Sequence, residues 1–273
     1  MFADERKARI LDAVNRQGRA TVAELSELLG ASASTIRRDL QDLEALGLLR
    51  RAHGGAVAAH IAAHVAGFEP TIEEKNVQLQ AEKFAIGQAA ARLVQPGDTV
   101  MMDAGTTTLQ VARHLPAQVT VITNSVDVAQ VMQMQAAQAQ GARAQLQVLL
   151  IGGQLRPATG ALVGPWAERA LSEVHVDILF LGANGIDPAR GITTPNPLEA
   201  SVKTAMVRAA RRVVLVADHS KCGQVSLMQV CSLRQVDIWV TDATPPPDVM
   251  AACEAQGVEV MVAPPPDAPD RQE

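Results

Sequence analysis

The sequence of 273 residues predicts two domains: a small helical domain with a short strand pair, followed by a larger α/β domain with a mostly parallel sheet. Two observations lead to this prediction. The first 57 residues contain short amphipathic helices that end in a Gly-rich strand pair. From residue 98 onward, short β-branched runs alternate with helical stretches, which is typical of a parallel sheet covered by helices.

Composition and charge restrict the class of protein. Hydrophobic residues make up 48% and charged residues 19%, as in ordinary globular proteins. The net charge of −5 excludes a uniformly basic coat, but residues 1–60 contain nine Lys and Arg against eight Asp and Glu, so the acidic excess lies beyond them. Cys222, Cys231 and Cys253 show no C-x-x-C spacing, which argues against a disulfide framework or a cysteine zinc site. With no membrane-length apolar run and no signal peptide, we expect a cytoplasmic protein without cofactor or metal.

We divide the chain into four segments. The small domain, a linker, the α/β domain and a disordered tail are predicted at residues 1–57, 58–75, 76–263 and 264–273. The linker is weakly patterned and the tail is rich in proline. His60 and His64 lie four residues apart in the linker, but no carboxylate or H-E-x-x-H context accompanies them, so they do not predict a metal site.

The small domain is predicted to contain three helices. The first spans residues 4–15 and the second residues 22–29, with Thr21 as the N-cap of the second and Gly30 at its end. Ser32 caps the third helix, so only three residues separate the second helix from the third. This spacing predicts a helix-turn-helix connection.

The third helix has an apolar face and a polar face. At 100° per residue, the face expected to point at the core carries Ala33, Ile36, Leu40 and Leu43. The opposite side carries Ser34, Thr35, Arg37, Arg38 and Gln41. Side chains of these types bind phosphates and base edges in the major groove of DNA.

The segment LLRRAHGGAV after the third helix predicts a β-hairpin wing, with Leu48 and Leu49 inside and the arginines outside. The polar helix face and the basic wing together indicate DNA binding. The alternative is a generic three-helix interaction module with solvated arginines. The predicted DNA-binding residues are Ser34, Thr35, Arg37, Arg38, Gln41, Arg50, Arg51 and His53.

The larger domain is predicted to contain seven strands separated by helices. The strands are expected at residues 99–102, 119–123, 147–151, 177–181, 213–217, 236–240 and 258–262. The helices are expected at residues 71–94, 109–115, 126–134, 165–174 and 198–211. The Gln- and Ala-rich segment 130–145 predicts a helix end followed by a solvated loop.

The segment DAGTTTL gives the clearest signal for a binding site. A strand ends at Asp103, Gly105 follows, and Thr106, Thr107 and Thr108 precede a helix. A helix N-terminus offers unpaired N–H groups and a positive dipole end, so a phosphate is the expected ligand. The loop is not a Walker A motif because it lacks G-K-[ST], and the alternative is that threonine merely caps the helix.

Polar residues and glycines also follow other predicted strands, and such strand ends converge at one edge of a parallel sheet. Lys221 would supply a point charge, while Asp103 and Asp218 would accept hydrogen bonds from sugar hydroxyls. Glu199 and Lys203 lie four residues apart on one helix face. They predict either a surface ion pair or a pocket carboxylate beside a lysine.

The chain resembles one family in both halves. The stretch SASTIRRDLQDLEALGLLRRAHGGAV is similar to the winged helix-turn-helix of the DeoR family, through TIRRDL and HGGA. This resemblance implies that Thr35, Arg37 and Arg38 contact DNA and that Asp39 orients the arginines. Residues 82–242 resemble the DeoR sensor domain through DAGTTT, VITNS, IGGQLR, GANGID and VADHSK. That domain resembles ribose-5-phosphate isomerase in fold.

The resemblance also implies an effector pocket. Together with the threonines of DAGTTTL, its predicted residues are Asp103, Gly105, Thr106, Thr107, Thr108, Asn124, Gly152, Gly153, Arg156, Gly185, Glu199, Lys203, Asp218 and Lys221. Two positions beside Lys221 depart from the family pattern. Cys222 stands where the family usually has Phe, and Gln224 stands where Arg is frequent.

These observations predict a transcriptional regulator. We expect a repressor of a sugar or polyol catabolic operon that binds operator DNA as a homodimer or tetramer and is released by a phosphorylated sugar or related metabolite. One alternative is a phosphosugar isomerase-like enzyme with a DNA-binding appendage, in which Glu199 would shuttle a proton. Another is an activator of the same family. The arginines opposite a helix core face argue against the enzyme, which has no use for them.

Overall fold

The chain forms two compact units, Met1–Pro70 and Thr71–Glu273. The structure is a computed structural model that describes residues 3–45, 48–52, 54–58, 75, 78–138 and 146–265. The predicted linker from residue 58 to residue 75 lies mostly outside these described residues, as do His60, His64 and the tail from residue 266.

In the described residues, the N-terminal unit contains three helices and a three-stranded antiparallel sheet. The helices are α1 (Ala3–Gln17), α2 (Val22–Leu29) and α3 (Ala33–Ala45). The sheet has the order β1-β3-β2, with β1 (Arg19–Thr21), β2 (Leu49–Ala52) and β3 (Gly55–Ala58). The three helices and the β2–β3 hairpin confirm the prediction, whereas β1 was not predicted because three residues show no period-two pattern.

The ends of α2 are set by three residues. The backbone N–H of Glu24 donates to Thr21 Oγ1 at 3.2 Å, and the Glu24 carboxylate accepts from the backbone N–H of Thr21 at 2.7 Å. This reciprocal arrangement is a capping box. Gly30 ends the helix in the left-handed conformation, with φ of 61°, which glycine adopts without a steric cost.

The core of the N-terminal unit lies between the three helices and the sheet. Its fully buried side chains include Ile10, Leu25, Ile36, Leu40 and Leu49. The prediction that Ala33 points at the core is wrong: Ala33 is exposed. It is the first residue of α3, and the core contacts of this helix begin one turn later, at Ile36.

The C-terminal unit is built on a seven-stranded sheet with the order β15-β14-β12-β9-β4-β5-β6. All neighbouring strands of this sheet run parallel, and each predicted strand is present. The strands are β4 (Thr99–Met102), β5 (Thr120–Thr123), β6 (Gln147–Leu150), β9 (Val176–Leu181), β12 (Ala210–Val216), β14 (Ile238–Thr241) and β15 (Glu259–Val262).

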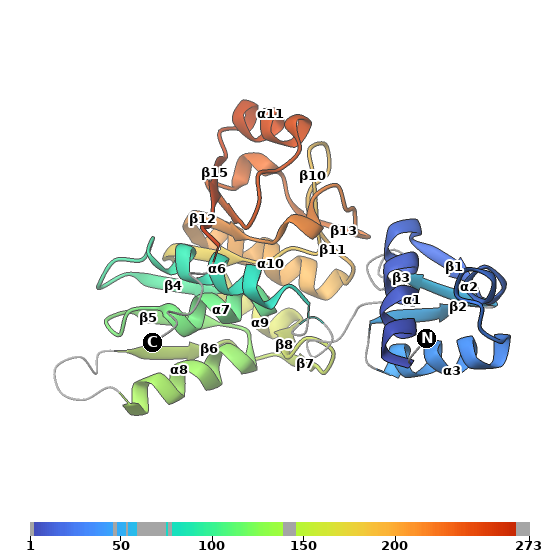
Figure 1. Ribbon diagram of the computed structural model, residues 1–273. Coiled ribbons are helices and arrows are strands. Elements are labelled where there is room, and N and C mark those ends of the chain that lie inside the picture. The colour runs from blue at the N-terminus through green and yellow to red at the C-terminus, as the bar shows by residue number, and fades with distance from the viewer. Residues whose placement is uncertain are drawn as a thin grey trace, which may run out of the picture. The chain divides into compact units, whose positions relative to one another are not determined.

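Helices cover both faces of this sheet (Figure 1). One face packs against α6 (Gln80–Ala91), α7 (Thr106–His114) and α8 (Val126–Gln138). The other packs against α9 (Pro165–Leu171), α10 (Pro197–Ala209) and α11 (Pro247–Gln256). Because both faces of the inner strands are buried, these strands contain continuous apolar runs. The helix α11 was not predicted, since its two buried residues, Val249 and Cys253, are too few to form an apolar stripe.

The described part of this unit also contains two smaller sheets and two short 3-10 helices. The hairpin consists of β7 (Gln154–Arg156) and β8 (Ala161–Val163). The second sheet has the order β10-β11-β13, with β10 (Gly185–Asp187), β11 (Gly191–Thr194) and β13 (Met228–Cys231). The 3-10 helices are η2 (His219–Lys221) and η3 (Leu233–Gln235).

The large sheet is wound in two directions. From β4 the chain proceeds outward through β5 to β6, and from β9 it proceeds outward through β12 and β14 to β15. The neighbours β4 and β9 therefore form the point where the winding reverses. In open α/β sheets, ligands bind at the carboxyl ends of the strands at this point. In the part of the chain that the structure describes, no helix is long and apolar enough to span a membrane.

Candidate functional site

A buried ion pair occupies the carboxyl ends of β4 and β9. Asp103 follows β4, and its carboxylate contacts the ammonium of Lys203 on α10. The backbone N–H of Gly182 donates to the same carboxylate at 3.0 Å, and Lys203 donates to the Gly182 carbonyl at 3.2 Å. Burial raises the pKa of Asp103, and the Lys203 ammonium opposes this effect. These contacts fix α10 against the sheet where the winding reverses.

A second ionic group lies one turn away on α10. The Glu199 carboxylate contacts the Arg156 guanidinium of β7 and accepts a hydrogen bond from Thr159 Oγ1 at 2.6 Å. Burial alone would raise the pKa of Glu199, but Lys203, the Thr159 hydrogen bond and Arg156 lower it below its usual range. The predicted alternative of a surface ion pair between Glu199 and Lys203 is wrong, because both side chains are buried and each contacts a different partner.

A third group lies at the end of β12. Asp218 Oδ1 accepts hydrogen bonds from the hydroxyl of Ser220 and from its backbone N–H, the latter at 3.1 Å. Asp218 Oδ2 is buried and has no hydrogen-bond partner among the described residues. Burial alone would raise the pKa of Asp218, but Lys221, Ser220 and Lys83 lower it. The carboxylate is therefore ionised at neutral pH with one oxygen available to a donor.

Lys83 belongs to this third group and was missed in the sequence. Its Nζ donates to the carbonyls of Lys75 at 2.5 Å and Gln78 at 2.7 Å. Burial lowers the pKa of Lys83 to about 8, with Lys221 and Lys75 acting in the same direction and Asp218 opposing. Its position in the sequence could have indicated that it is buried. Lys83 lies three residues before the buried Ile86 and therefore on the side of α6 that faces the sheet.

The N-terminus of α7 lies beside the Asp103–Lys203 pair. Its N-cap residue is Gly105, and no side chain caps the helix, so the alternative in which threonine caps it is not what the structure shows. Thr106 and Thr107 are buried in the first turn. Thr108 donates its hydroxyl to the Gly105 carbonyl at 2.9 Å, so that hydrogen is not available to a ligand. No side chain therefore occupies the N–H groups of the first turn, an arrangement that can bind an anion at a helix N-terminus.

The remaining predicted pocket residues differ in what they do. The Asn124 amide donates to the Leu162 carbonyl at 3.1 Å, and its buried oxygen has no partner among the described residues. A Cβ on Gly153 would lie 2.7 Å from the Val163 carbonyl oxygen, and a Cβ on Gly185 would lie 2.3 Å from the Gln224 carbonyl oxygen. These two glycines are therefore required by close backbone packing. A Cβ on Gly152 would meet open space.

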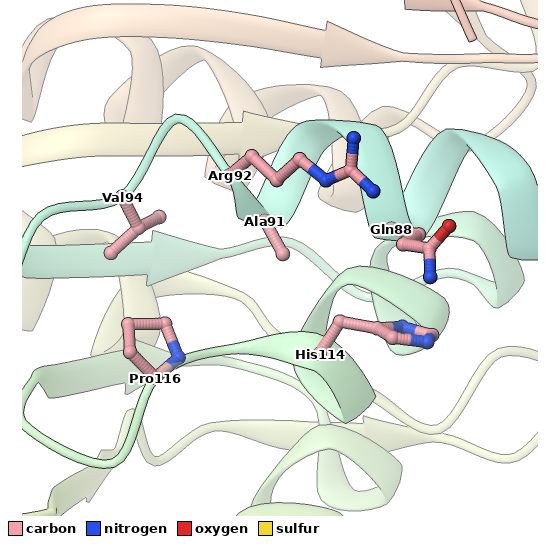
Figure 2. Close-up of a pocket in the computed structure, with 6 residues that line it drawn as sticks. All are labelled: Gln88, Ala91, Arg92, Val94, His114 and Pro116. Atoms are coloured by element: carbon pink, nitrogen blue, oxygen red, sulfur yellow. The ribbon is translucent and has the colours of Figure 1, made fainter. Parts of the chain in front are cut away.

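A shallow depression of about 350 Å³ lies elsewhere, where α6 and α7 end. Its lining is formed by Gln88, Ala91, Arg92, Val94, His114 and Pro116. Figure 2 shows these side chains around the ends of the two helices. None of the predicted effector residues lines this depression, which lies on the side where the strands begin.

The predicted DNA-binding residues of α3 lie on one surface. Ser34, Arg37, Arg38 and Gln41 are exposed, and Thr35 is half-buried. Ser32 Oγ accepts from the backbone N–H of Thr35 at 3.2 Å, which confirms it as the cap of this helix. Arg50 and Arg51 lie in β2, but their side chains and all of His53 are outside the described residues.

Asp39 connects α3 to α1. Its carboxylate accepts two hydrogen bonds from the Arg6 guanidinium, at 2.5 Å and 3.2 Å. The expectation that Asp39 orients the arginines of its own helix is wrong, because Asp39 lies on the buried side of α3, beside Leu40. A parallel contact joins Lys7 to Asp42 at 2.7 Å. The position of the recognition surface on α3 therefore depends on ion pairs to α1.

Both units match descriptions of known domains. Residues 6–62 match the DeoR-like helix-turn-helix domain, and residues 78–243 match the DeoR C-terminal sensor domain. The chain belongs to the DeoR family of transcriptional regulators. A DeoR-family protein of this architecture is a DNA-binding regulator whose larger domain is a sensor, as the sequence predicted.

Curated relatives of this DeoR-family regulator match along nearly the whole chain. The HTH-type transcriptional regulator GlpR of Haloferax volcanii is 42% identical over 96% of this chain and 98% of its own length. The HTH-type transcriptional repressor GlcR of Bacillus subtilis is 33% identical over 96% of this chain and 97% of its own. The transcriptional repressor AccR of Agrobacterium fabrum is 36% identical over 88% and 89%.

Solved structures show only a distant likeness to this DeoR-family regulator. Ribose 5-phosphate isomerase A from Methanocaldococcus jannaschii is 17% identical and covers 51% of this chain and 53% of that chain, with a TM-score of 0.36. The α/β fold of the sensor domain is established by its own seven parallel strands.

Proposed function

We propose that this regulator is a repressor that leaves its operator when a phosphorylated sugar, polyol or related metabolite binds at the carboxyl ends of β4, β9 and β12. The observation that carries the proposal is the open N-terminus of α7 beside the buried Asp103–Lys203 pair. An anion at this point meets free N–H groups and the positive end of the helix dipole. The relatives GlcR and AccR are named as repressors, which supports repression over activation.

The groups around the anion site suit the rest of such a ligand. Lys221 and Lys83 supply positive charge near Asp218, whose buried Oδ2 can accept a hydrogen bond from a ligand hydroxyl. The unpartnered oxygen of Asn124 can accept another. Anion-binding groups beside hydroxyl acceptors are what a phosphorylated polyhydroxy compound requires.

The DNA-binding part of the proposal rests on α3 and the wing. Arg37 and Arg38 are exposed on the recognition helix, and we assign DNA contacts to them, to Ser34, Thr35 and Gln41, and to the wing residues Arg50, Arg51 and His53. One such helix reads one half-site, so a homodimer, or dimers paired into a tetramer, would bind an operator with two half-sites. Because the protein would act on operator DNA, we propose that it works in the cytoplasm.

Release of the operator needs only modest coupling between the two domains. A coupling free energy of about 1–3 kcal/mol per site changes operator affinity by roughly 5- to 150-fold. The effector has to bind the released state more tightly than the DNA-bound state by this amount.

We further propose that the protein is not an enzyme. An isomerase would need a carboxylate that accepts and returns a proton, and Glu199 is the candidate. Its lowered pKa makes it a weak base at neutral pH, and contacts with Arg156 and Thr159 hold it in place. Turnover of any pentose or hexose phosphate that disappears in Glu199→Gln would contradict this assignment.

A thermal-shift screen of the purified chain against sugar and polyol phosphates tests the effector proposal. A ligand at 100 times its dissociation constant adds about 2.7 kcal/mol to the free energy of unfolding. This stabilisation raises the midpoint temperature of unfolding measurably. The same compounds without phosphate are the control, because they lack the group that binds at α7. Equal shifts with and without phosphate, or no shift across the panel, would overturn the proposal.

A further inference from the structure

The outer edge of the large sheet at β6 is apolar. Leu149 and Leu150 point to opposite faces of this strand, and they are 45% and 47% exposed. β6 pairs with β5 on one side, and the described residues place no strand on the other (Figure 1). Consecutive apolar residues are typical of an inner strand, because neighbouring elements cover both of its faces. The strand β6 has such a sequence although it lies at the edge of the sheet.

The opposite edge of the same sheet is different. Strand β15 begins with the exposed, charged Glu259 and is soon followed by Pro264 and Pro265. Charges and prolines are the usual protection of an edge strand against pairing with another chain. Residues 146–155, which contain β6, include no charged residue. The sheet is therefore protected at one edge and unprotected at the other.

The exposed apolar side chains continue beyond β6. Leu155 of β7 is 51% exposed, and Trp166 at the start of α9 is 80% exposed. The start of α9 lies against the β6–β7 connection, since a Cβ on Gly153 would be 3.3 Å from Ala167 Cβ. We call Leu149, Leu150, Leu155 and Trp166 the β6 surface. Exposed tryptophan is a common anchor of protein interfaces.

We propose that the β6 surface is the interface between two copies of this chain, with their β6 strands paired antiparallel about a two-fold axis. An edge strand is complementary to itself under this symmetry. The sequence beyond residue 60 carries six more acids than bases, so two copies meet the least electrostatic repulsion at an uncharged surface such as this one. The need for two copies rests on the proposed function, in which each recognition helix reads one half-site.

This interface would share the β7–β8 hairpin with the effector site. Leu155 is part of the β6 surface, and the next residue, Arg156, contacts Glu199 on α10. Successive residues of a strand point to opposite faces, so one short strand presents one side chain to the partner copy and the other to the site. A ligand that displaces Arg156 would therefore move the edge of the interface.

Sedimentation of the full chain over a concentration series tests the proposal, because it reports association without DNA or effector. We expect the wild type to sediment at twice the 28.9 kDa chain mass, or at four times if dimers pair, and Leu149→Lys to raise the dissociation constant of the dimer at least tenfold. Val262→Lys is the matched control, since Val262 is 44% exposed on the other edge strand of the same sheet. A monomeric wild type, or an unchanged dissociation constant in Leu149→Lys, would overturn the proposal.

A cysteine variant covers the case in which the lysine variant does not fold. With a short bismaleimide, Leu149→Cys is expected to give a covalent dimer, whereas Val262→Cys and the wild type, with its own three cysteines, are not. Cross-linking of all three proteins alike would contradict the assignment. The result is independent of the effector: if no phosphorylated ligand binds, the proposed function fails, but the sedimentation outcome still decides the interface.

Discussion

Lys203 and Asp103 form a buried ion pair although 100 positions of sequence separate them. Asp103 ends β4, and Lys203 lies on the helix that connects β9 to β12, so the pair joins the two oppositely wound halves of the sheet. It also lies beside the open N-terminus of α7. The same two residues therefore hold the fold together and shape the candidate effector site.

We predict that Lys203→Met lowers the free energy of unfolding by about 3–5 kcal/mol, because it leaves the Asp103 carboxylate buried without its cation. The double variant Asp103→Asn/Lys203→Met is expected to recover a large part of this loss. Urea denaturation measures both. Arg169→Met is the control, since Arg169 and Glu173 form an exposed pair at 3.8 Å. Equal losses in the single and double variants would mean that the buried charge is not the cause.

Lys221→Ala is expected to leave operator binding unchanged and to abolish release by the effector, because Lys221 lies in the sensor domain at the end of β12. The measurement is operator affinity with and without the ligand identified in the screen. Arg234→Ala removes an exposed cation from η3 and serves as the control. Normal release in Lys221→Ala would exclude this lysine from the effector site.

The affinity for a phosphorylated effector is predicted to fall as the pH rises through about 8, the pKa of Lys83. The ammonium attracts the anion and the neutral amine does not, so above this pH binding must first add a proton. The ligand phosphate is a full dianion over this range and does not change. Calorimetric titrations from pH 7 to pH 9 should show a loss of up to tenfold per pH unit.

Lys83→Met provides the control for this pH dependence. It should bind the ligand more weakly at pH 7 and lose the decline above pH 8, because the amine whose pKa is about 8 is no longer present. A decline of the same size in Lys83→Met would assign the pH dependence to another group.

On the DNA side, Arg38→Ala should cost about 1–3 kcal/mol of operator affinity if Arg38 reads a base, and should lower the salt slope by about 1 if it binds a phosphate. Titrations at several salt concentrations separate the two. Arg16→Ala is the control: Arg16 is an exposed arginine of α1 that pairs with Asp12. Unchanged affinity of Arg38→Ala at every salt concentration would remove Arg38 from the DNA contacts.

Gly87 permits close packing of two helices, and Gly87→Ala is expected to destabilise the sensor domain. A Cβ at this position would lie 2.6 Å from the Gln110 backbone of α7. Overpacking costs about 1–3 kcal/mol, which outweighs the roughly 1 kcal/mol that alanine gains over glycine in a helix. Thermal unfolding with Gly152→Ala as control checks this, since a Cβ on Gly152 meets open space. A higher midpoint for Gly87→Ala would contradict the packing argument.

The large sheet could be predicted from the sequence because each of its strands contains an apolar run, which in the inner strands results from burial on both faces. The short strands β7, β10 and β11 could not, since three or four residues show no periodicity and their pairing depends on distant segments. The caps of α2 were predictable because Thr21, Glu24 and Gly30 act within a few residues.

The residues of the candidate site also include some that the sequence reveals and some that it does not. Asp103 and the threonines of α7 are contiguous in sequence, so the motif itself revealed them. The spacing of Glu199 and Lys203 suggested that they pair with each other, but burial directs each to a partner from another element, Arg156 and Asp103. Lys83 was missed because one lysine in an apolar stretch has no motif, and only the packing of α6 shows what surrounds it.

The close contact at Gly87 has a mechanical consequence. Because a Cβ on Gly87 would lie 2.6 Å from the Gln110 backbone, α6 and α7 are in direct backbone contact, and a shift of one helix is expected to displace the other. The proposed anion site lies at the start of α7. A ligand phosphate that shifts α7 is therefore expected to shift α6 as well, and with it Lys83, whose charge acts on Asp218.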